Sequence, residues 1–165
     1  MNYRKLLLAA VAACTVGIGS AQAAMMQDSG AGGGKLEGTW IVQVGLQDCV
    51  SGSPMGLPFL SLLTFARGGT MTETTDNPVF YPAVRSPGHG VWQKVDEHTY
   101  QAATIAFITV NGVLARTQTI RQTIEVQDED TFRTTSAAVK FYRPDGSLLA
   151  TGCAAATGKR FELAE

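Results

Sequence analysis

Two histidines are the residues of this sequence best suited to proton transfer near neutral pH. His89 stands in a Gly-His-Gly sequence, and His98 follows an Asp-Glu pair. Imidazole titrates between about pH 5 and 8, so it can act as an acid or base or contact a polar ligand group. His89 is therefore a candidate ligand contact, with capping of the loop backbone as the competing interpretation, and we expect His98 to be solvated. Two histidines without a Cys-x-x-Cys pair are too few for zinc, so we expect neither a metal nor a cofactor.

Two arginines and one lysine on threonine-rich segments would be notable if their side chains faced inward. Arg116 and Arg121 are an odd number of residues apart, so in an extended strand they face opposite sides. One of them facing inward would meet an acidic group, but we expect both to lie outside the fold or at its rim. Lys140 is an even number of residues from Phe132 and Tyr142 and would share their face. The register that decides these directions stays open.

The sequence shows no recognisable catalytic nucleophile. Ser51, Ser53 and Ser61 have no positioned base, and no Gly-x-Ser-x-Gly elbow occurs. The glycine-rich run at 30–34 follows no strand pattern and opens no helix, so it is not a phosphate loop. We therefore predict no catalytic residue and favour a protein that is not an enzyme, with catalysis kept open as an alternative.

The first 23 residues have the pattern of a bacterial secretory signal peptide. Arg4 and Lys5 give a positive start, residues 6–18 are apolar, and Ala21-Gln22-Ala23 is a small-x-small end. We expect cleavage after Ala23 and a periplasmic or secreted protein. The apolar run is shorter than the about 20 residues of a membrane span, and no other segment comes close, so we expect no transmembrane segment.

A second interpretation of the same region places a lipid anchor on Cys14, because residues 11–14 (VAAC) resemble a lipobox. The residues after Cys14 stay apolar through Ile18 instead of turning polar, so we favour cleavage over anchoring. Residues 24–34 are rich in glycine and are typical of a flexible leader. Residues 35–165 are then expected to form a single domain.

Charge and composition argue against nucleic acid as a partner. Without residues 1–23, the chain has 11 basic and 14 acidic residues, a net charge of −3. Its longest basic run is Lys159-Arg160, and no basic patch is apparent. Nothing in the sequence indicates an oligomeric state.

Two cysteines remain once the signal is removed, Cys49 and Cys153. An even number of cysteines in an oxidising compartment favours a disulfide. Cys49 follows the first expected strand and Cys153 lies inside the last, so they can pair if those strands are neighbours. The bridge would close a loop of about 100 residues, worth about 4–5 kcal/mol by the chain-entropy argument. Two separate buried thiols are the alternative.

The elements that must position these residues are strands. In KLEGTWIVQV, at 35–44, apolar residues alternate with polar ones, which is typical of a half-buried strand. Further strand-like segments lie at 59–66, 70–75, 90–95, 99–110, 113–126, 131–143 and 147–163. Asn111-Gly112 between two of them is a strong hairpin signal. We predict an all-β protein whose eight strands close into an antiparallel up-and-down β-barrel.

Two longer connections interrupt this regular spacing. One covers 50–58, and the other covers 76–88, where three prolines are expected to exclude regular pairing. Connections of this length are often lids or binding loops.

The first strand resembles the lipocalins and related calycin barrels through Gly38-Thr39-Trp40. More specifically, the chain is similar to small secreted bacterial lipocalin-like proteins. The pattern is a Leu-Thr-Phe strand end at 63–65, a Gly-Gly turn at 68–69, Gly-His-Gly-x-Trp at 88–92 and a closing Gly-Lys-Arg at 158–160. We expect no helix after the barrel of the kind that many lipocalins carry, since few residues follow Arg160 in this sequence.

This resemblance implies a floor and a cavity. Trp40 is expected to close the narrow end of the barrel, with Arg160 stacked on its indole in a cation–π contact. The adjacent glycine is expected to let the chain approach the ring closely. The function implied is binding of a small apolar or amphipathic molecule inside the barrel. The expected wall and lid residues are Phe65, Phe80, Tyr81, His89, Trp92 and Phe107. A filled barrel acting as an interaction module and a cyclase or isomerase remain as alternatives.

Overall fold

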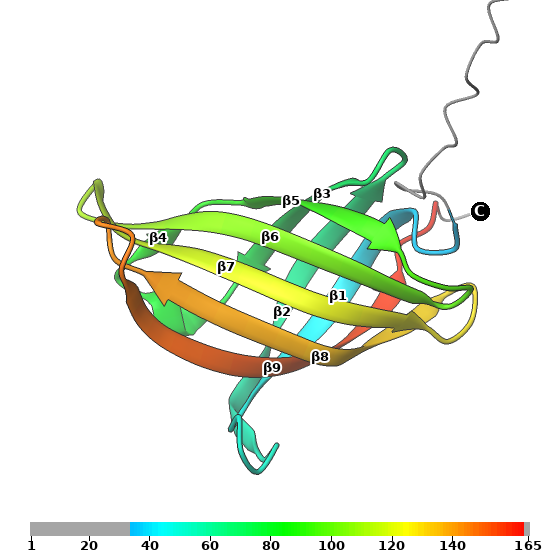
Figure 1. Cartoon of the computed structure of the whole chain (residues 1–165), viewed down its shortest axis with the longest axis horizontal. Coiled ribbons are helices and arrows are strands. Elements are labelled where there is room, and N and C mark those ends of the chain that lie inside the picture. Colours follow the sequence, from blue (N-terminus) through cyan, green and yellow to red (C-terminus); the bar gives the residue numbers. More distant parts are fainter. Residues whose placement is uncertain (1–33, 164–165) are drawn as a thin grey trace, which may run out of the picture.

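The computed structural model describes residues 34–163, which form a closed antiparallel β-barrel (Figure 1). Its strands are β1 (Gly38–Gln47), β2 (Pro54–Ala66), β3 (Thr70–Asp76), β4 (Val84–Arg85), β5 (Gly88–Lys94), β6 (Thr99–Val110), β7 (Val113–Val126), β8 (Thr131–Tyr142) and β9 (Leu148–Arg160). The sheet order is β4-β6-β5-β3-β2-β1-β9-β8-β7, and β6 also pairs with β7, which closes the wall. The short β4 pairs with β6 beyond the end of β5, so eight long strands make the barrel. The predicted fold class is confirmed. The predicted signal peptide and most of the predicted leader lie outside the described residues.

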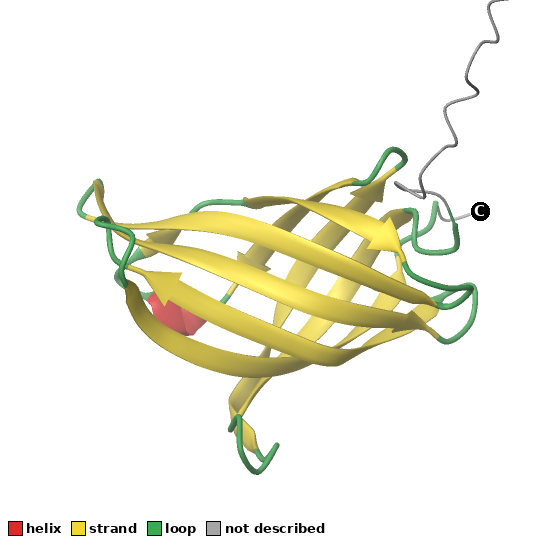
Figure 2. Cartoon of the chain, in the orientation of Figure 1, coloured by secondary structure: helices red, strands yellow, loops and turns green. Residues whose placement is uncertain are grey.

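Both long connections contain more structure than the sequence suggested. β2 begins at Pro54, and its first residues pair with Leu46 and Gln47, so the connection expected at 50–58 is in part a hairpin. The connection at 76–88 holds the 3-10 helix η1 (Pro78–Phe80) and β4 (Figure 2). The expectation that its prolines exclude regular pairing is wrong, because Val84 and Arg85, which lie between Pro82 and Pro87, still pair with β6. No helix in residues 34–163 is long and apolar enough to cross a membrane.

A β-bulge in β8 changes which side chains face inward. In the pairing of β7 with β8, Ile124 lies opposite Thr134 and the preceding Thr123 lies opposite Ser136. Thr135 is therefore one extra residue in β8. Before the bulge, Phe132 is buried, and after it Val139 is buried while Lys140 is exposed. The prediction that Lys140 shares a face with Phe132 is therefore wrong, because the extra residue reverses the alternation.

Trp40 closes one end of the barrel. Its side chain is fully buried, its Nε1 donates to the Leu36 carbonyl at 2.9 Å, and its ring meets Phe132 edge-on at 4.9 Å between centroids. The guanidinium carbon of Arg160 lies 4.2 Å from the centre of the Trp40 ring, within cation–π range, as the resemblance implied.

Arg160 also connects the segment before β1 with the turn between β7 and β8. Its Nη1, Nη2 and Nε atoms donate to the carbonyls of Glu37, Lys35 and Glu129 at 2.7, 2.6 and 2.6 Å. Gly38 has a φ of +122°, and a Cβ there would lie 2.8 Å from Arg160 Nη1. Gly38 is thus required because of its positive φ and because a side chain there would collide with Arg160. The resemblance had implied a different reason, namely close approach of the chain to the Trp40 ring.

Trp92 belongs to the same floor. Its Nε1 lies 3.0 Å from both the Ala66 and Thr70 carbonyl oxygens, and it meets the rings of Phe65 and Tyr100 at 5.8 Å. These aromatic residues form a continuous buried cluster with Trp40 and Phe132. A packed floor of this kind seals one end of the barrel and leaves any opening to the other end.

The floor predicts an alkaline loss of stability through Tyr100. Burial raises the pKa of the Tyr100 phenol, and the negative charges of Glu37 and Asp96 raise it further. The backbone amides of Lys35 and Leu36 lower this pKa, but by less than burial raises it. Above about pH 10 the unfolded chain ionises this tyrosine first, so the folded state binds more protons and its stability falls as pH rises. In urea titrations at increasing pH, Tyr100→Phe should therefore lose less stability than the parent above that pH. Parallel losses in the two proteins would contradict this.

Candidate functional site

The barrel interior above the floor is a cavity of about 650 Å³. This size falls in the range of small-molecule sites. Apolar side chains make most of its wall: Val42, Val44, Leu46, Phe59, Leu63, Ile120, Val139 and Phe141. Small residues of β8 and β9 face it as well, namely Ala137, Gly152, Ala154 and Ala156. Because these residues are small, the interior opposite β2 and β3 stays hollow.

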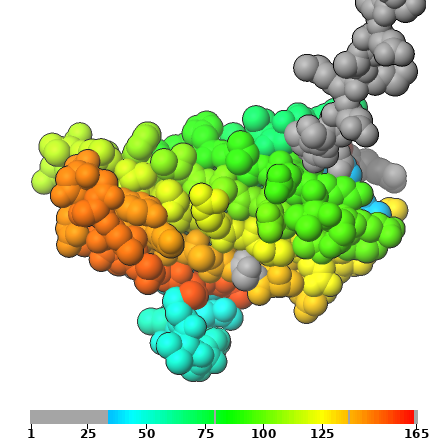
Figure 3. Space-filling view, in the orientation of Figure 1, coloured from blue at the N-terminus to red at the C-terminus, as the bar shows by residue number. Residues whose placement is uncertain are grey.

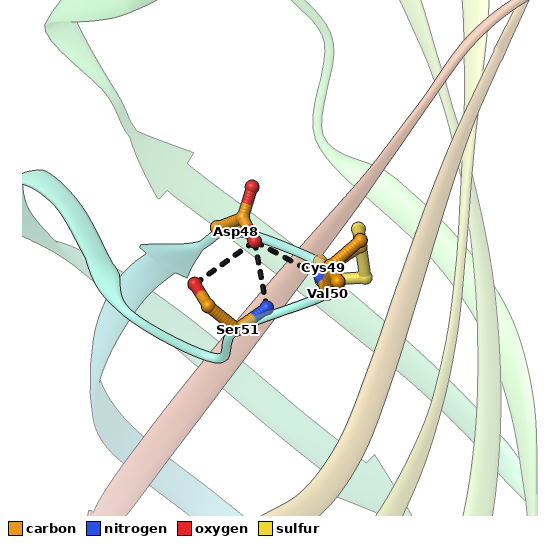
Figure 4. The surroundings of a disulfide bond; sticks show 5 residues. Asp48, Cys49, Val50 and Ser51 are labelled. Carbon is orange, nitrogen blue, oxygen red and sulfur yellow. Dashed lines mark hydrogen bonds between the residues drawn. A yellow bond between two sulfur atoms is a disulfide. The ribbon is translucent and has the colours of Figure 1, made fainter.

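The β1–β2 hairpin forms part of the mouth of this cavity and projects from the barrel (Figure 3, cyan). A disulfide joins Cys49 after β1 to Cys153 in β9, with 5.2 Å between the two Cα atoms and a sequence separation of 104 (Figure 4). The predicted pairing is confirmed. Since β1 and β9 are hydrogen-bonded neighbours, the bridge fixes the base of the hairpin to the wall.

Asp48 holds the turn beside this disulfide. Its Oδ1 accepts hydrogen bonds from the Ser51 amide at 2.7 Å, the Ser51 hydroxyl at 2.9 Å and the Val50 amide at 3.0 Å (Figure 4). These bonds, the Ser51 amide first, lower the pKa of Asp48. Its carboxylate is therefore committed to the turn, although it lies at the cavity rim.

A buried polar cluster lies in the wall of the cavity. The side chains of Arg85 and Glu73 are only 4% and 8% exposed and form an ion pair at 3.0 Å. Glu73 also accepts hydrogen bonds from Thr104, at 3.0 Å, and from Thr75. Arg85 Nε donates to Oε1 of Gln118. Both charges are thus paired, as buried charges must be.

Arg116 is the cation of the cavity that lacks an acidic partner. It is half-buried, lines the cavity from β7, and its guanidinium carbon lies 5.6 Å from the centre of the Phe141 ring. No carboxylate of residues 34–163 is within ion-pair distance of it. The expectation that both arginines lie outside the fold or at its rim agrees with the exposed Arg121, whereas Arg116 lines the cavity from the part of β7 near the β6–β7 turn.

The structure separates the residues expected to form the wall and lid. Phe80, from η1, lines the cavity. Phe65 and Trp92 lie in the floor cluster, and Trp92 also borders a second, more polar hollow over β5, β6 and β7. Tyr81 is 88% exposed, Phe107 is 52% exposed, and His89 is also exposed, so these three do not line the cavity.

Sequence reasoning missed the polar residues of the site. None of Glu73, Arg85 and Gln118 was among the predicted site residues. The available signal was alternation: Arg116, Gln118, Ile120 and Gln122 share one face of β7. Among the described residues, no group of three or more His, Cys, Asp and Glu side chains is placed to hold a metal.

No protein-family model matches the chain, and no curated protein sequence matches it. Among solved structures, the chain is similar to a redesigned β-barrel at 14% sequence identity and a TM-score of 0.43. The match covers 78% of this chain and 93% of that one. The description of the fold therefore rests on the strand pairing and the cavity themselves.

Proposed function

We propose that this protein binds a small apolar or amphipathic molecule inside its barrel. The observation that carries the proposal is the cavity of about 650 Å³, whose wall is mostly apolar and holds a few converging polar groups. Such cavities are typical of small-molecule sites. Binding would remove the apolar surface of a ligand from water, which contributes about 25 cal/mol per Å².

The two alternatives have less support. A barrel acting only through its outer surface would be expected to fill its interior with side chains, and the small residues of β8 and β9 leave this one hollow. A cyclase or isomerase would need a free acid or base in the cavity. The buried carboxylate there, Glu73, is occupied by Arg85, Thr75 and Thr104.

Adjacent alanines on β8 provide a matched test of the cavity. Ala137 lines it, and Ala138 is exposed on the other face. We expect Ala137→Phe to occupy the cavity and to reduce the binding of the neutral fluorescent probe N-phenylnaphthylamine by about tenfold or more, while Ala138→Phe binds it like the parent. A tenfold loss corresponds to about 1.4 kcal/mol. Fluorescence titration gives the affinity, and circular dichroism checks that both variants are folded.

Equal binding by the parent and Ala137→Phe would place the probe outside the barrel. Failure of the parent to bind this probe or dodecanol would contradict the proposed function.

We also propose that the protein works in an oxidising compartment after removal of residues 1–23. The Cys49–Cys153 disulfide is compatible with the periplasm or the cell exterior. The amino-terminal pattern supports export, with lipid anchoring at Cys14 less favoured. The denatured mass of protein purified from its host tests this, because cleavage after Ala23 and a retained lipid give different masses.

A further inference from the structure

We propose that the ligand is a single-chain amphipathic carboxylate whose head group binds Arg116 and Gln118. This inference rests on the proposed function and names the chemical class of its ligand. The two residues are two positions apart on β7, both line the cavity, and their α-carbons are therefore about 7 Å apart on one face.

The orientation of the Gln118 amide follows from its neighbour. Arg85 Nε can only donate, so the Gln118 atom that it contacts is the carbonyl oxygen. The Gln118 residue is 6% exposed, and its amide nitrogen has no hydrogen-bond partner among residues 34–163. The Tyr100 hydroxyl is fully buried without a partner, whereas the Gln118 amide nitrogen is not fully buried. Gln118 lines the cavity. The amide therefore presents N–H donors to the cavity.

Arg116 supplies the charge. Its guanidinium has only donors, lies near the Phe141 ring, and has no acidic partner in the described part of the chain. Asp48 is the remaining acid of the cavity rim, and its Oδ1 is engaged by the turn. Glu73 is paired with Arg85. The cavity thus offers a guest one uncompensated cation and, two positions along β7, the amide donor of Gln118.

These donors define the head group. A carboxylate has one negative charge and two acceptor oxygens, which matches one guanidinium and one amide. A phosphate monoester carries about −1.5 to −2 at neutral pH, so a single cation would leave charge uncompensated in an apolar cavity. The apolar wall, including Ile120 and Val139, is then available for the chain of the ligand.

The test compares dodecanoate with dodecanol, which has the same chain and no charge. Each is titrated below its aggregation concentration against the parent loaded with N-phenylnaphthylamine. We expect Arg116→Met to weaken dodecanoate about tenfold or more and to leave dodecanol unchanged, because a hydrogen bond to a charged group is lost. Gln118→Glu keeps an acceptor for Arg85 and places a carboxylate toward the ligand, so it should also weaken dodecanoate selectively. Arg121→Met, on the exposed face, is the control and should bind both like the parent.

The outcomes separate the two proposals. If dodecanol and the probe bind while Arg116→Met leaves dodecanoate affinity unchanged, the head-group inference is overturned and the proposed function stands. If Arg116→Met weakens both ligands equally, the arginine shapes the cavity and does not recognise charge, which also overturns the inference. If neither ligand nor probe binds the parent, the proposed function itself fails.

Discussion

Replacing Trp40 by alanine should lower the free energy of unfolding by about 3–5 kcal/mol, the usual cost of truncating a large buried aromatic side chain. Trp40 is fully buried, packs on Phe132 and lies under Arg160. Its indole N–H also holds the Leu36 carbonyl. Removing the ring therefore leaves a hole at the closed end and frees the segment that precedes β1.

Ile41 is the matched control for this experiment. It is the next residue on β1, faces outward and is 42% exposed. Ile41→Ala should cost much less, since surface substitutions usually change stability by about 0.5 kcal/mol. Urea titration followed by far-ultraviolet circular dichroism measures both variants. If Trp40→Ala unfolds at the same urea concentration as the parent, Trp40 does not stabilise the closed end of the barrel.

The fold could be predicted because most of its signals are local. Alternation in KLEGTWIVQV marks the inward face of β1, and Asn111-Gly112 marks the β6–β7 hairpin. The disulfide could be predicted from the expected oxidising compartment and from β1 and β9 being neighbours in a closed barrel. The bulge in β8 has no comparable signal in the sequence. Thr134, Thr135 and Ser136 are all small polar residues, so their pattern favours neither register over the other.

The candidate site was harder to predict because it depends on register and on pairs that are distant in sequence. Arg85 lies in a connection that looked like a lid, and it reaches Gln118, which is 33 residues away. The aromatic residues chosen as wall and lid were selected by type, and the structure distributes them between the floor, the cavity and the outer surface. Residue type indicates what a side chain can bind, but the direction of each strand decides whether it faces the cavity.

Breaking the buried Glu73–Arg85 pair should be as costly as losing Trp40. Arg85→Met leaves the Glu73 carboxylate buried without its cation, which we expect to lower the free energy of unfolding by about 3–5 kcal/mol. Glu73→Leu leaves the arginine without its acid and should cost a similar amount. The double variant Glu73→Leu/Arg85→Met should cost far less than the sum, because an apolar pair of similar volume often replaces a buried ion pair at little cost.

A double-mutant cycle by urea titration measures this coupling, and additive costs would show that cavity water, and not the partner residue, satisfies each charge.

The same variants connect stability with recognition. In the double variant the fold is expected to be retained, but Gln118 loses the Arg85 donor that orients its amide. Its carbonyl oxygen can then face the cavity and oppose a carboxylate. Dodecanoate should therefore bind more weakly to the double variant than to the parent, while dodecanol does not, which would show that the ion pair serves the site by orienting Gln118.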